Sequence, residues 1–146
     1  MTAEGLHFLY AFASLLVICA LTTLTCCLVS GEPIRLKTFM KVFGILWLVL
    51  IINIFTLDMD SPLKMIFAGL GILASYLLIY RFRGRKLILR TFTAMAIEFG
   101  GDMFTGFAFL NLFDSQTVAA MRYMTAPSTI LLQAVCGGSM VCFAML

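Results

Sequence analysis

Residues 6–29, LHFLYAFASLLVICALTTLTCCLV, form the apolar stretch that decides the fold class. A helix of this length is about 36 Å long, more than the roughly 30 Å of a bilayer's hydrocarbon core. The turn-forming run from Ser30 to Pro33 follows it directly. The stretch is longer than the apolar part of a signal peptide, and no basic residue precedes it. We therefore expect a retained transmembrane helix.

The composition of the whole chain also indicates a membrane protein. Of its 146 residues, 62% are hydrophobic and 12% are charged, and the mean hydropathy is +1.07. Soluble domains are about half apolar and a quarter charged. The composition excludes a disordered chain, a disulfide scaffold and a protein that mainly binds nucleic acid. Five spans would use the whole length and leave no room for a soluble catalytic domain.

Four further apolar stretches follow the first. We expect an all-α, polytopic transmembrane bundle of about five spans that forms a single domain over residues 1–146, with no soluble domain. The expected spans are residues 6–29, 42–57, 63–80, 90–113 and 128–146. The lipid bilayer is thus the first expected partner.

The basic residues indicate how these spans are oriented. Eight of the ten Lys and Arg residues lie in two connectors, one with Arg35, Lys37 and Lys41 and one with Arg81, Arg83, Arg85, Lys86 and Arg90. Short loops rich in Lys and Arg stay in the cytoplasm. We therefore expect the amino terminus outside and the carboxyl terminus at the cytoplasmic face of the plasma membrane. The second cluster would be a cytoplasmic anchor.

Two carboxylates in the fourth span are candidates for a functional site. Glu98 and Asp102 are four residues apart, so they share one helix face at a separation of about 6 Å. Insertion scales assign such residues about 3 kcal/mol at the centre of a span, and they usually face the bundle interior or a water-filled cavity. One interpretation is an intramembrane polar switch, or a cation or proton site, with Asn53 and Gln133 as polar partners. The other is that both acids lie near the cytoplasmic end and are solvated by the basic cluster.

No motif indicates catalysis or a resident cofactor. The sequence contains no HExxH, no phosphate-binding glycine loop in a helical context, no Ser or Cys beside a His and no CxxC pair. The five cysteines lie within apolar runs, where we expect small buried side chains rather than a disulfide framework. We therefore expect neither an enzyme nor a metal site in this chain.

The order of these features resembles a family of receptors. A long outward-starting span, a basic connector and a short acidic loop precede YRFRGRKLILR (80–90) and then AIEFGGDMFTGF (96–107). The pattern covers nearly the whole chain. It is similar to the amino-terminal membrane region of peptide-sensing histidine kinases of the accessory-gene-regulator receptor type, whose catalytic half has the GHKL ATPase fold. Nothing in this sequence matches the phospho-acceptor helix or the ATP-binding lobe of that family.

The resemblance implies a sensor module of a bacterial two-component, quorum-sensing system. Such a module binds an extracellular signal, such as a secreted peptide, and as a dimer passes it by helix movement to a cytoplasmic output domain that this chain lacks. The fifth span has no closing basic residue, which favours an output domain beyond Leu146. The resemblance also implies that the outer loops face the ligand, with Asp58, Asp60, Asp114 and Arg122 as candidates.

Two other functions remain open from the sequence. One is a small transporter or channel subunit that uses the face formed by Glu98 and Asp102. The other is a structural subunit that packs against a larger membrane complex.

Overall fold

A computed structural model of the chain shows only helices as regular secondary structure among the residues that it describes. The described residues are 3–56, 63–114, 116 and 129–146. The helices are α1 (Ala3–Ser30), α2 (Leu36–Thr56), α3 (Leu63–Leu78), α4 (Gly84–Leu112) and α6 (Thr129–Met145), and these residues contain no strand. The expected all-α fold class is confirmed.

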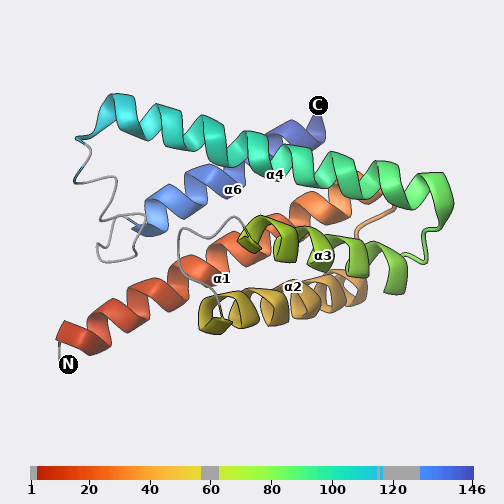
Figure 1. Cartoon of the computed structure of the whole chain (residues 1–146), viewed down its shortest axis with the longest axis horizontal. Helices are drawn as coiled ribbons and strands as arrows, with labels where there is room; N and C mark the ends of the chain where they lie inside the picture. The colour runs from red at the N-terminus through yellow and green to blue at the C-terminus, as the bar shows by residue number, and fades with distance from the viewer. Residues whose placement is uncertain (1–2, 57–62, 115, 117–128) are drawn as a thin grey trace.

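The five helices form one bundle in which successive helices run in opposite directions (Figure 1). Each helix packs on the next in the order α1, α2, α3, α4, α6, and α6 returns to α1. The helices thus form a closed ring, and α1 also contacts α4 across it. The amino terminus lies at one end of the bundle, and the α1–α2 and α3–α4 connections lie at the other.

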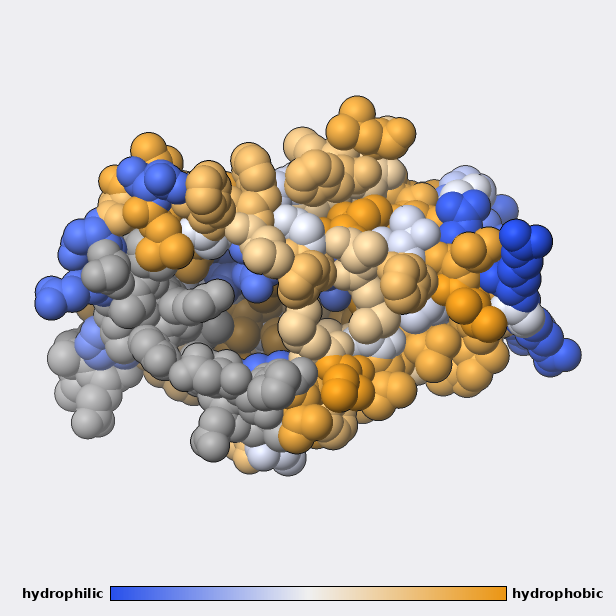
Figure 2. All heavy atoms as spheres, turned by 45° about the horizontal axis from the view of Figure 1, so that its top comes forward, coloured by the Kyte–Doolittle hydropathy of each residue, from blue (hydrophilic) through white to orange (hydrophobic). Residues whose placement is uncertain are grey.

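Two of the helices meet the length and composition of a membrane span. They are α1, over Gly5–Ser30, and α2, over Leu36–Thr56. The apolar helices α3 and α6 have 16 and 17 residues, fewer than the ~20 of a typical span. In Figure 2 hydrophobic side chains cover much of the middle of the visible face, and hydrophilic side chains gather toward its ends.

Helices α2 and α4 begin several residues before the spans expected from the sequence. Helix α2 begins at Leu36, so Lys37 and Lys41 lie on its first turns rather than in a connector. Helix α4 begins at Gly84, whose φ of +57° lets the chain turn directly into the helix. Arg85, Lys86 and Arg90 are therefore helical. Lys and Arg are good helix formers, so the helices extend past the apolar stretches.

Hydrogen bonds join α3 and α4 to the last turns of α1, at the end of the bundle that carries the α1–α2 and α3–α4 connections. Arg90 Nη1 of α4 donates to the Val29 carbonyl at 2.6 Å. Tyr76 Oη of α3 donates to the Cys26 carbonyl at 2.9 Å, and Tyr76 is completely buried. The final carbonyls of a helix carry partial negative charge and lack partners within the helix. Arg90 thus has a structural role in addition to the expected one as an anchor.

Glycines allow close helix contacts at a few positions. A Cβ atom would collide at Gly137 with Leu21 of α1, at Gly101 with Met140 of α6, and at Gly69 with Met95 of α4. At Gly100, Gly106 and Gly138 nothing lies within 4 Å of an added Cβ. Small residues that let helix backbones approach are typical of membrane helix packing. The α1–α6 and α4–α6 contacts therefore depend on single glycines.

Candidate functional site

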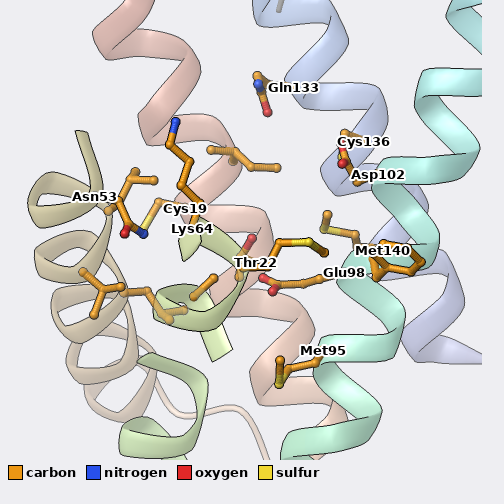
Figure 3. Close-up of a pocket in the computed structure, with 17 residues that line it drawn as sticks. Cys19, Thr22, Asn53, Lys64, Met95, Glu98, Asp102, Gln133, Cys136 and Met140 are labelled. Atoms are coloured by element: carbon orange, nitrogen blue, oxygen red, sulfur yellow. The ribbon is translucent and has the colours of Figure 1, made fainter. Parts of the chain in front are cut away.

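A cavity of about 380 Å³ lies inside the ring of helices, and all five described helices contribute to its wall (Figure 3). Its polar lining residues are Thr22 of α1, Asn53 of α2, Lys64 of α3, Glu98 and Asp102 of α4, and Gln133 of α6. Aliphatic, aromatic and sulfur-containing side chains make up most of the remaining wall. A mostly apolar cavity with a few polar groups is typical of small-molecule sites, and this volume is near the small end of their range.

Glu98 lies at the inner part of the cavity. Its carboxyl group extends from α4 toward the Thr22 side chain of α1 (Figure 3). Glu98 is eight residues beyond Arg90, which places it about 12 Å further along the α4 axis. The Arg90 guanidinium bonds the Val29 carbonyl instead. The geometry therefore favours the cavity interpretation of Glu98 over solvation by the basic cluster.

Asp102 lies one turn further along α4 and also lines the cavity. It is more exposed than Glu98, which is half-buried. The two carboxylates therefore lie one helical turn apart on the same wall of the cavity, and Asp102 is further from the basic end of the bundle.

Asn53 supplies a buried acceptor on the opposite side. The residue is only 7% exposed, and its Oδ1 has no hydrogen-bond partner among the described residues. Figure 3 shows its amide in the space between α2 and α1. A buried polar atom without a partner costs about 1–3 kcal/mol. Asn53 Oδ1 is therefore available to a donor that enters the cavity.

The remaining polar lining residues lie near helix ends. Lys64 is the second residue of α3, and Gln133 is the fifth residue of α6. Asn53 lies three residues before the end of α2. These three helix ends belong to the same end of the bundle as the amino terminus (Figure 1). The polar lining therefore runs from the middle of the bundle toward that end.

The structure brings together all four residues of the expected intramembrane polar switch, because Asn53, Glu98, Asp102 and Gln133 line the same cavity. The polar lining also contains Thr22 and Lys64, which were not among the four expected residues. A lone lysine at the start of an apolar helix was the signal for Lys64.

The structure describes only one of the four loop residues expected to face a ligand, Asp114. Asp58, Asp60 and Arg122 lie outside the described residues. Asp114 follows α4, is exposed and does not line the cavity.

The expected anchor residues lie at the other end of the bundle. Arg81, Arg83, Arg85 and Lys86 are exposed, and the Lys86 amine lies 4.1 Å from the centre of the Phe82 ring. A second depression is lined by five residues of α4: Arg85, Lys86, Leu89, Arg90 and Thr93. The basic surface and the acidic cavity are therefore distinct features.

Comparisons with protein-family models, with curated proteins and with solved structures give no match for this chain.

Proposed function

We propose that this chain is a five-span membrane sensor module that binds a small extracellular ligand in the cavity between its helices. The single observation that carries the proposal is that cavity, which all five helices line and which holds the Glu98 carboxyl and the unpartnered Asn53 Oδ1. Binding would shift the helices and pass the signal to a cytoplasmic output domain.

The packing supports membrane insertion of all five helices. Helices α3, α4 and α6 pack around α1 and α2, the two that are long enough to span. Helix α4 exposes large apolar side chains along its length, at Phe92, Phe99, Met103 and Phe107. Such a surface fits lipid and not water. A bilayer accommodates short helices such as α3 and α6 by local thinning and by extended flanking side chains.

The charge distribution supports ligand entry from outside. The basic end would be cytoplasmic by the positive-inside rule. Asn53, Lys64 and Gln133 lie toward the opposite end, so a polar ligand would enter there. Gln133, Cys136 and Met140 place three successive turns of α6 on the cavity wall. Helix α6 would therefore be the output helix, in a homodimer like those of the receptors that this sequence resembles.

The closed basic end favours a sensor over a transporter or channel subunit. A permeation path would need polar lining to continue past Glu98. Instead Ile72, Tyr76, Val42 and Cys26 are completely buried in one hydrophobic core cluster. Each lies in the half of its helix that is nearer the basic end. A path along this route would have to open a packed core.

The test uses the chain in lipid nanodiscs with a fluorescent label on the exposed Cys142 of α6. The low-molecular-mass fraction of medium conditioned by the source organism is added. We expect it to change the label's emission and to protect Cys136, in the cavity wall, from N-ethylmaleimide. Glu98→Gln should abolish both effects, whereas Asp114→Asn, an equal charge change outside the cavity, should retain them.

Two results would count against the sensor proposal. Loss of the response in Asp114→Asn but not in Glu98→Gln would place binding at the outer loops and contradict the cavity proposal. Cation flux in proteoliposomes that is lost in Glu98→Gln would support the transporter alternative instead.

A further inference from the structure

We infer that the cavity selects a small organic ammonium ion with a short apolar body. The inference rests on the proposed function and specifies its ligand. It depends on the juxtaposition of two carboxylates on one face of α4 with a buried amide oxygen of α2 that has no donor. The acids alone would not identify a ligand, but Asn53 Oδ1 is an independent acceptor that lines the same cavity.

The balance of charges and hydrogen-bonding groups favours a cation. Glu98 and Asp102 supply two carboxylates, and Lys64 is the one basic residue among the described residues of the lining. Figure 3 shows the Lys64 amine directed away from the Glu98 carboxyl. A bound monovalent cation would balance the remaining negative charge, and charges in hydrocarbon surroundings are usually paired. A primary ammonium has three N–H donors, one for each acceptor group: the Glu98 carboxylate, the Asp102 carboxylate and the Asn53 amide oxygen.

The rest of the wall favours an organic cation over a metal ion. Mg²⁺ and Ca²⁺ bind six or more oxygen ligands at short distances. Around the acceptors this cavity offers aliphatic side chains and the thioethers of Met95 and Met140. Methionine side chains adapt to irregular apolar ligands. The volume of about 380 Å³ suits a molecule much smaller than a folded peptide.

The test uses Cys136 as a reporter, since it lines the cavity and is 6% exposed. The full chain in nanodiscs is labelled with N-ethylmaleimide, and the rate at each cysteine is followed by mass spectrometry. Three probes of equal chain length are compared: n-hexylammonium, n-hexanol and n-hexanoate. We expect n-hexylammonium to protect Cys136 at a concentration at least tenfold below that of n-hexanol, and n-hexanoate to give no protection. Labelling of the exposed Cys142 should not change, which controls for effects on the lipid.

Variants separate charge recognition from general binding. Glu98→Gln and Asp102→Asn should each weaken protection by n-hexylammonium about tenfold and leave protection by n-hexanol unchanged. Asp114→Asn is the matched control and should behave as the parent chain. Asp102 is exposed, so its variant should fold even where Glu98→Gln does not. Emission of Trp47, the sole tryptophan, verifies the fold of each variant.

The outcomes distinguish this inference from the proposed function. Equal protection by n-hexylammonium and n-hexanol would overturn the ammonium preference and leave a ligand-binding cavity. Stronger protection by n-hexanoate would overturn it too and indicate that Lys64 dominates. A Cys136 that reacts only after unfolding would contradict an accessible cavity, and with it both proposals.

Discussion

Replacing Gly137 with alanine tests a close contact between α6 and α1. A Cβ atom on Gly137 of α6 would lie 2.5 Å from Leu21 Cβ and 3.0 Å from Leu21 Cγ of α1. Leu21 Cβ is attached directly to the α1 backbone, so a change of rotamer cannot move it away. The two helices would have to separate, and they form the most extensive helix pair in the bundle.

The adjacent glycine is a matched control that sets the expected magnitude. An alanine at Gly138 would meet no heavy atom within 4 Å. Both substitutions gain about 0.5–1 kcal/mol because alanine favours a helix over glycine. Only Gly137→Ala also overpacks the interface, which typically costs about 1–3 kcal/mol. We therefore expect Gly137→Ala to be less stable than Gly138→Ala by about 1–3 kcal/mol.

The assay is unfolding of the detergent-solubilised chain by sodium dodecyl sulfate, followed by circular dichroism and Trp47 fluorescence. Gly101→Ala should fall between the two, because its nearest contact is Cγ of Met140, a flexible side chain. Equal stability of Gly137→Ala and Gly138→Ala would refute the α1–α6 contact as described. Because α1 and α6 also form part of the cavity wall, that result would also count against the described geometry of the site.

The remaining predictions concern the two ends of the bundle. Tyr76→Phe removes the hydroxyl that donates to the Cys26 carbonyl, and we expect a loss of about 0.5–1.5 kcal/mol in the same titration; no loss would mean that the hydrogen bond does not form. Arg90→Gln removes the charged donor to the Val29 carbonyl, so hydrogen exchange at residues 30–35 should become faster, and unchanged exchange would count against this tie. In the folded chain Cys142 should react first with N-ethylmaleimide, because the other four cysteines are buried; simultaneous reaction would contradict the packing. Green fluorescent protein fused to the carboxyl end should fluoresce in cells, and alkaline phosphatase there should be inactive, if that end is cytoplasmic; the reverse result would reject the proposed orientation.

The positions of the helices could be predicted from the sequence much better than their ends. The stretch 6–29 lies within α1, and all four later apolar stretches correspond to helices. The ends differ because hydropathy marks the part of a helix that suits lipid, whereas a helix continues through any good helix former. Lys37 and Lys41 on α2 and Arg85 on α4 are examples.

The cavity could be predicted only in part. A carboxylate in an apolar span indicates an interior position, which is where Glu98 lies. The rotation of each helix could not be read from the sequence, as adjacent glycines show. A Cβ added at Gly101 would meet Met140, whereas one added at Gly100 would meet nothing within 4 Å, although the two glycines are adjacent in the sequence. One residue changes the direction along a helix by 100°, so only packing decides which glycine forms the contact.

Met140 connects the cavity to the contact between α4 and α6. Its side chain lines the cavity and also fills the space beside Gly101. A ligand that displaces this side chain would change the separation of the two helices at that point. The far ends of α3 and α4 are held to α1 through Tyr76 and Arg90. Movement caused by the ligand would therefore be carried mainly by α6, which is the displacement that the proposed sensor function requires.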